Sequence, residues 1–132
     1  MAKGDARPTD GIVLAITFLY YRDLPRAMEF YESVLGFELV IDQGFSKIYR
    51  IDGQAHVGLV DETRGMQKWA PQKTVQVCLR VPDGDAWHAW AKSRNVDALT
   101  EPRNNHELGI RAFVFCDPEG YQIEVQSVLA AA

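Results

Sequence analysis

Two segments of the sequence carry polar side chains at every second residue, with apolar side chains between them. The polar positions are Gln76, Cys78, Arg80, Gln122 and Glu124. Because successive side chains of a β-strand point to opposite faces, each set would share one face of a sheet. Amide and guanidinium groups can orient a polar substrate, and a carboxylate in a partly apolar enclosure can act as a general base. We predict that Glu124 is the catalytic residue if the chain is an enzyme, and that Gln76, Arg80 and Gln122 bind substrate.

A structural role for Glu124 is an equally supported alternative. Buried charges in proteins are usually paired. Glu124 could therefore form an ion pair with Arg80 or with Arg111, which lies in another β-like segment. Cys78 shares the predicted polar face, but the sequence places no base next to it, so a nucleophilic thiol is a minor option.

Aromatic and imidazole side chains occupy alternating positions of two further β-like segments. Phe18, Tyr20 and His56 are expected on the same concave face as the polar residues. Aromatic walls would suit a partly flat or apolar ligand, whose polar end Arg80, Arg111 or Tyr20 could hold. The alternatives are core packing for the two aromatics and a strand-edge position for His56.

Composition and missing motifs exclude several classes of function. The 132 residues carry a formal net charge of −4, which argues against nucleic acid or anionic lipid as a partner. No apolar run approaches the roughly 20 residues that a membrane-spanning helix needs. The sequence lacks a glycine-rich phosphate loop, an HExxH helix and a GxSxG elbow. Its two cysteines favour reduced, buried thiols in a cytoplasmic protein over a disulfide-stabilised secreted domain.

Periodicity predicts ten secondary-structure elements in two similar halves. In the first half we expect strands at residues 12–21, 37–42, 45–51 and 55–60 and a helix at 24–35. In the second half we expect strands at 74–81, 96–100, 110–116 and 121–127, a helix at 86–94 and a polar loop at 102–108.

The two halves read as an internal repeat. Asp23 and Asp83 each precede a predicted helix, as helix-capping residues do, and they lie 60 residues apart. We therefore predict an α+β fold of paired βαβββ modules that form a concave mixed sheet, the cup. A single domain would span residues 12–129, with halves 12–61 and 73–129 joined by loop 62–72. Residues 1–11 would form a flexible arm.

Two motifs resemble the signatures of a known superfamily. The first consists of Tyr21-Arg22-Asp23-Leu24, Phe30-Tyr31 and Leu35-Gly36-Phe37, and the second spans residues 109–124 around Asp117-Pro118-Glu119-Gly120. Together they resemble the vicinal oxygen chelate superfamily of glyoxalases, bleomycin-resistance proteins and extradiol dioxygenases. The resemblance implies the same paired βαβββ fold and a homodimer in which cups of two chains combine.

The resemblance also implies one divalent metal, held by one residue from each of four strands. The matching positions are Ile16, Gly58, Gln76 and Glu124. Ile16 and Gly58 offer no side-chain donor, whereas a catalytic metal needs about three protein ligands. The donor set favours no metal over one divalent metal; if a metal is present, His56, Gln76 and Glu124 are its expected ligands.

Three functions remain open from the sequence. The resemblance implies a small organic molecule as partner, either transformed by a glyoxalase-like lyase or dioxygenase-like enzyme, or bound and sequestered without chemistry. The sequestered compound would be an antibiotic or a metabolite. The third function is a scaffold whose cup is filled by its own side chains.

Overall fold

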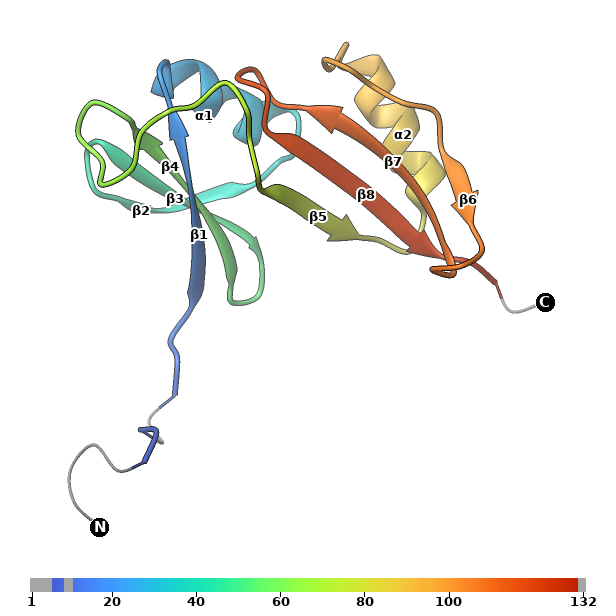
Figure 1. The fold of residues 1–132 in the computed structure, drawn as a ribbon, viewed down its shortest axis with the longest axis horizontal. Coiled ribbons are helices and arrows are strands. Elements are labelled where there is room, and N and C mark those ends of the chain that lie inside the picture. Colours follow the sequence, from blue (N-terminus) through green and yellow to red (C-terminus); the bar gives the residue numbers. More distant parts are fainter. Residues whose placement is uncertain (1–5, 9–10, 131–132) are drawn as a thin grey trace.

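Two βαβββ modules follow one another in the computed structural model, which describes residues 6–8 and 11–130 (Figure 1). The first contains β1 (Ala15–Tyr21), α1 (Leu24–Ser33), β2 (Glu38–Asp42), β3 (Ser46–Asp52) and β4 (Ala55–Asp61). The second contains β5 (Gln76–Arg80), α2 (Gly84–Ser93), β6 (Arg103–Asn105), β7 (Ile110–Cys116) and β8 (Gln122–Val128). This element order confirms the predicted α+β fold of paired modules. Most of the arm predicted over residues 1–11 lies outside the described residues.

Each module forms its own four-stranded mixed sheet. The strand orders are β1-β4-β3-β2 and β5-β8-β7-β6, so both sheets have the same topology. In each, the first strand pairs in parallel with the last, and the remaining neighbours are antiparallel. Across residues 6–8 and 11–130, no strand of one sheet pairs with a strand of the other. The two sheets lie side by side along the long axis of the molecule (Figure 1).

Both helices begin at the predicted aspartates. The Asp23 carboxylate accepts a hydrogen bond from the backbone N–H of Arg26 at 3.2 Å, and Asp83 accepts one from Ala86 at 3.1 Å. These bonds satisfy N–H groups that have no partner within the helix. Pro25 stands in the first turn of α1, where its missing N–H costs nothing.

One predicted strand is absent and another lies where a loop was expected. Residues 96–100 make only one isolated bridge, between Asp97 and Cys116. Asn95 and Ala98 both adopt a φ of 54°, in the left-handed region, which interrupts an extended strand. The segment before β7 forms a strand that pairs with β7 only at β6, which lies inside the predicted polar loop 102–108.

Each sheet has one face covered by helix and one that is not. The covered faces carry the buried residues Leu19, Tyr21, Val57, Leu59, Val77, Leu79, Phe113, Phe115, Ile123 and Val125. We call the opposite face of each sheet its cup face, since it holds the residues that alternation assigned to the cup.

A buried polar network joins the two modules. Asp117, in the turn between β7 and β8, accepts hydrogen bonds at Oδ2 from the hydroxyls of Tyr21 at 2.5 Å and Tyr31 at 2.9 Å. Its Oδ1 accepts the backbone N–H groups of Glu119 and Tyr121 at 3.0 and 2.9 Å. Burial raises the pKa of Asp117 above its usual value, although these hydrogen bonds partly oppose that rise. Burial, together with the nearby carboxylate, also raises the pKa of both tyrosines, which keeps them protonated as donors.

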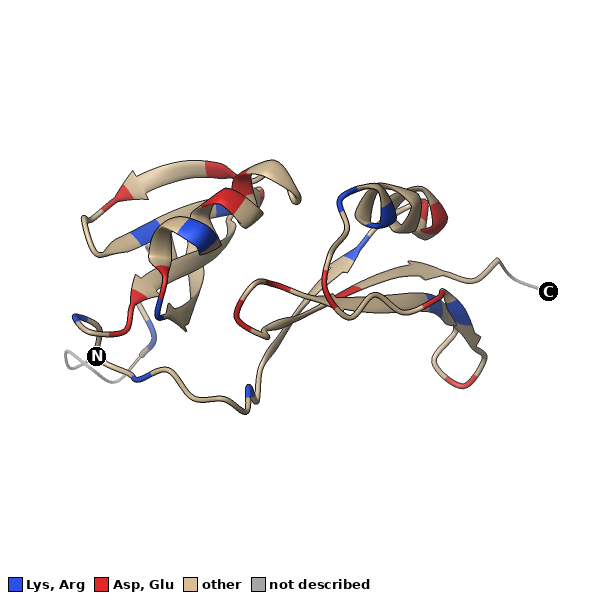
Figure 2. Ribbon diagram, turned by 90° about the horizontal axis from the view of Figure 1, so that it is seen from above, with Lys and Arg blue, Asp and Glu red and all other residues tan. Residues whose placement is uncertain are grey.

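Charged residues are distributed over both modules. Lys and Arg alternate with Asp and Glu along the ribbon in Figure 2, and no long stretch of one sign is visible. Neither of the two described helices is long and apolar enough to cross a membrane.

Candidate functional site

On the cup face of the second sheet, β5 and β8 carry a row of polar side chains that are hydrogen-bonded in pairs across the two strands. Parallel pairing of β5 with β8 places Gln76 opposite Gln122, Cys78 opposite Glu124 and Arg80 opposite Gln126. The side chains of each pair are bonded to one another, at 2.6 Å, 3.4 Å and 2.7 Å respectively. Ile123 and Val125 on the other face are completely buried, so alternation assigned Glu124 to its observed face. The face can therefore present amide, carboxylate and guanidinium groups to one ligand.

Glu124 has neutral partners only. Its Oε2 accepts the Cys78 thiol and the Gln126 amide, the latter at 2.6 Å. Within the described part of the chain it forms no ion pair, because Arg80 donates to Gln126 instead. The side chain is half-exposed on an open face and not enclosed by the single chain. Its negative charge is thus available to a ligand.

Arg111 is not part of this row. Its guanidinium lies on the helix-covered side of β7 and pairs with Asp85 of α2 at 3.0 Å. A second hydrogen bond, also 3.0 Å, goes to Asn104. These two contacts give Arg111 a structural role on the helix-covered side, away from the cup-face residues.

The two cysteines are unpaired but not buried, contrary to the sequence prediction. Cys78 is exposed because its side chain lies on the uncovered cup face of β5, and Cys116 is half-exposed. Burial, followed by the hydrogen bond to Glu124, raises the pKa of the Cys78 thiol to about 11. The reactive species is the thiolate, so this environment suppresses nucleophilicity near neutral pH.

Cys78 should consequently react with iodoacetamide only at high pH. In a Cys116→Ser background we expect slow alkylation at about pH 8, rising roughly tenfold per pH unit until the thiol ionises near pH 11. Glu124→Gln removes a negative charge and should move this profile to lower pH. Mass spectrometry of timed samples measures the rates. A midpoint at the ordinary thiol value of ~8.5 in both proteins would contradict the assignment.

The cup face of the first sheet is mainly apolar around β1 and β4, whereas Arg50 of β3 and Glu38 of β2 form an ion pair on the same face. Ile16, Phe18 and Tyr20 of β1 lie opposite His56, Gly58 and Val60 of β4. The Phe18 ring lies directly on Gly58, since a Cβ atom at residue 58 would be 2.4 Å from Phe18 Cδ1. Glycine is therefore required there, and an aromatic ring fills the space above it. Phe18 remains 41% exposed.

His56 is buried at one end of this face. Its Nδ1 lies 2.8 Å from the carbonyl oxygen of Gln54. It belongs to the first sheet, whereas Gln76 and Glu124 belong to the second. No hollow found in the described chain is lined by two of these three residues.

Several cup-face residues were not among the predicted site residues, including Gln126, Ser46 and Arg50. Gln126 bridges Arg80 and Glu124, and it stands two residues after Glu124, so the same alternation would have identified it. Ser46, at the start of β3, pairs with Val60 and is only 5% exposed. Its alternation with buried Ile48 was the available signal.

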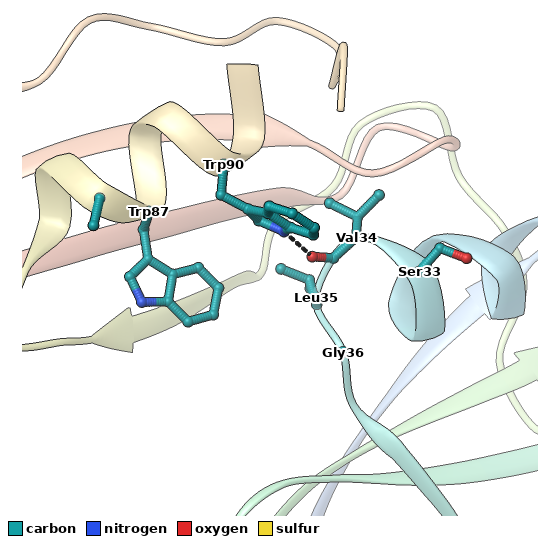
Figure 3. A pocket seen from close by; sticks show the side chains of 7 residues that line it. Ser33, Val34, Leu35, Gly36, Trp87 and Trp90 are labelled. Carbon is teal, nitrogen blue, oxygen red and sulfur yellow. Dashed lines mark hydrogen bonds between the residues drawn. The ribbon is translucent and has the colours of Figure 1, made fainter. Parts of the chain in front are cut away.

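A groove between the two helices lies away from both cup faces. A groove of about 350 Å³ separates the end of α1 from α2 and is walled by Leu35, Trp87 and Trp90 (Figure 3). The Trp90 indole N–H donates to the Val34 carbonyl at 2.6 Å, which uses the polar group nearest the groove. None of the predicted site residues lines it. It offers apolar surface but no titratable group.

The paired topology and the cup faces agree with a comparison of the sequence with known families. The profile described as Glyoxalase/Bleomycin resistance protein/Dioxygenase superfamily matches residues 13–125. The chain belongs to this superfamily. No functionally curated protein matches the sequence.

Three solved structures share the fold. A lactoylglutathione lyase from Agrobacterium tumefaciens is 22% identical, with 92% of this chain and 96% of that one covered and a TM-score of 0.69. TnmS3, an antibiotic binding protein from Streptomyces sp. CB03234, is 24% identical, with coverage of 92% and 99% and a TM-score of 0.73. The fosfomycin resistance protein FosX from Listeria monocytogenes is 15% identical, with coverage of 86% and 91% and a TM-score of 0.68. At these identities the comparisons establish the fold alone.

The metal position of the superfamily does not fit the residues present. Of the four positions implied by the resemblance, Ile16 contributes hydrocarbon and Gly58 lies beneath the Phe18 ring. Among the residues that the structure describes, no three His, Cys, Asp or Glu side chains gather as a metal site needs. The remaining two positions, Gln76 and Glu124, are engaged with neighbouring side chains. We therefore derive no chemistry from a metal at this position.

Proposed function

We propose that this superfamily member binds a small organic molecule on its cup faces without a metal. The proposal rests on the contrast between the two faces: hydrocarbon around Phe18 on the first sheet, and hydrogen-bonding groups around Glu124 on the second. Ligand sites usually combine apolar walls with a few polar groups that fix orientation. Antibiotic-binding and fosfomycin-resistance proteins among the structural neighbours support an antibiotic or a metabolite as the ligand.

We also propose a cytoplasmic homodimer. In one chain both cup faces are open, and β1 and β5 are edge strands of their sheets. A partner chain could bring its polar face against the apolar face of the first and enclose a ligand between them. The unpaired Cys78 and Cys116 support a reducing compartment. The net charge of −4 supports a partner other than nucleic acid or membrane.

A metal-independent enzyme is the second candidate. The observation that favours it is a carboxylate without a cationic partner on the described chain, at Glu124. Such a carboxylate can accept a proton from a bound substrate. Tyr20, Arg80 and His56 would then orient that substrate.

A ligand screen with a chelator tests the proposal. Thermal unfolding of the purified protein with a library of antibiotics and metabolites should identify a compound that raises the melting temperature. We expect the rise to persist in EDTA, because the site needs no metal. Glu124→Gln should weaken binding of that compound at least about tenfold, since hydrogen bonds to a charged group contribute ~1.5–3 kcal/mol.

Glu29→Gln, on the exposed side of α1, is the matched control and should bind as the wild type does. Isothermal titration gives the affinities. Loss of the stabilisation in EDTA, or equal affinity of the Glu124 and Glu29 variants, would overturn the proposal. Retained binding with lost turnover in Glu124→Gln would favour the enzyme.

A further inference from the structure

A small hollow lies at one end of the first cup face, away from Glu124. Ser46 of β3, Val60 of β4 and Tyr20 of β1 are direct neighbours across three strands and form its floor. Aromatic and apolar groups surround that floor, and its volume is about 210 Å³. The complete lining is Phe18, Tyr20, Gln43, Phe45, Ser46, Val60, Gly65 and Met66. No charged side chain is among them.

The hydroxyl group of Ser46 has no hydrogen-bond partner among the described residues. Ser46 is 5% exposed, and its Oγ is completely buried. Buried polar atoms are nearly always paired, because an unpaired one forfeits its hydrogen bonds to water. An unpaired hydroxyl beside a hollow therefore requires an explanation.

A tight turn after β4 borders the hollow and packs against Val60 and Tyr20. Arg64 and Gly65 donate their backbone N–H groups to the Asp61 carbonyl, both at 3.0 Å. A Cβ atom at Gly65 would lie 2.6 Å from Val60 and 2.7 Å from the Tyr20 ring, so only glycine allows this approach. The next residue, Met66, is 92% exposed, and its unbranched side chain can adapt to a ligand entering beneath it.

We propose that this hollow holds one aromatic ring bearing a neutral hydrogen-bonding substituent. The Ser46 hydroxyl, closed off from solvent in the ligand-free chain, would rotate about the Cα–Cβ bond to become the partner of that substituent. An apolar cavity of about 150 Å³ is known to bind benzene, and complete drug-sized ligands need ~300 Å³ or more. The observed volume thus suits a single substituted ring. Phe18 and Tyr20 offer ring faces and edges for stacking, whereas one face of Phe45 is covered by the Arg64 guanidinium at 4.9 Å from the ring centroid. Serine can donate one hydrogen bond and accept others, which matches a phenol or a carbonyl group.

The inference rests on the proposed function, because the ring would be one part of the larger cup ligand. It adds the chemical class of that part. The polar row around Glu124 would contact other groups of the ligand, so the two regions can be tested separately.

Phenol and toluene form a matched pair of probes, equal in size but with and without a hydroxyl group. We expect titrations followed by ¹⁵N–¹H NMR to shift resonances of Tyr20, Ser46 and Gly65, with phenol binding about three- to tenfold more tightly than toluene. Ser46→Ala should abolish that preference and leave toluene binding unchanged. The variant should fold, because it deletes only an unpaired atom.

Ser33→Ala is the control, since Ser33 lines the tryptophan groove of Figure 3. It should retain the wild-type preference for phenol. The proposal is overturned if Ser46→Ala retains the preference, if neither probe shifts the three resonances, or if phenol shifts only residues of the tryptophan groove. Glu124→Gln should not affect phenol binding. If phenol does not bind as predicted but a larger ligand binds in a Glu124-dependent way, only this inference is wrong. If phenol binds as predicted but no larger ligand depends on Glu124, only the proposed function is wrong.

Discussion

Replacing Asp117 with alanine should lower the free energy of unfolding by about 3–5 kcal/mol. The carboxylate accepts hydrogen bonds from Tyr21, Tyr31, Glu119 and Tyr121, and it is 1% exposed. Without it, the Tyr31 hydroxyl and the backbone N–H groups of Glu119 and Tyr121 lose their acceptor, and the Tyr21 hydroxyl keeps only the Tyr31 oxygen at 3.1 Å. Removal of one partner from a buried charged network typically costs this much. Urea denaturation followed by circular dichroism measures the change.

Two further variants define the origin of that loss. Asp117→Asn keeps the shape but replaces one acceptor oxygen with a donor, so it should be destabilised nearly as strongly. Asp97→Ala, at an exposed position nearby, should change stability by no more than about 0.5 kcal/mol. A loss below about 1 kcal/mol for Asp117→Ala would show that the network does not hold the modules together.

Phe115→Ala should also destabilise the protein by about 3–5 kcal/mol. Phe115 is 1% exposed and contacts Phe113 of its own strand and Phe30 of α1, with ring centroids 6.1 and 6.2 Å away. Deleting its ring leaves a cavity between the modules, which adds to the lost transfer free energy. Thermal and urea unfolding both measure this change.

Phe45→Ala is the matched control, because Phe45 is 37% exposed. It should cost clearly less, since a partly solvated ring leaves no closed cavity. Equal losses for the two variants would contradict the view that Phe115 packs the joint between modules.

Local patterns predicted the elements that are fixed by local physics. Asp23 and Asp83 marked both helix starts, because capping depends on a side chain and the N–H group three residues later. Alternation gave the faces of Gln122 and Glu124, because Ile123 and Val125 could only face the core.

Long-range contacts were beyond the reach of such patterns. Asp117 looked like an ordinary turn residue, yet its partners Tyr21 and Tyr31 stand far earlier in the chain. Arg111 shares a strand face with Phe113, but the sequence alone left open which face that is; the pairing with Asp85 of α2 shows that α2 covers it. The left-handed backbone at Ala98 had no glycine to signal it. Periodicity within a strand also carries no information on how two sheets are placed relative to one another.

The tyrosine–aspartate joint constrains how the protein can fold during synthesis. Tyr31 and Tyr21 precede their acceptor by 86 and 96 residues. At a translation rate of about 5–20 residues per second, the acceptor is made roughly 4–17 s after Tyr31. The strands of the first module can pair during that interval, but the phenol hydroxyls and the outer side of α1 have no counterpart yet. We therefore expect the first half of the nascent chain to stay incompletely packed, and exposed to chaperones, until its second half has been translated.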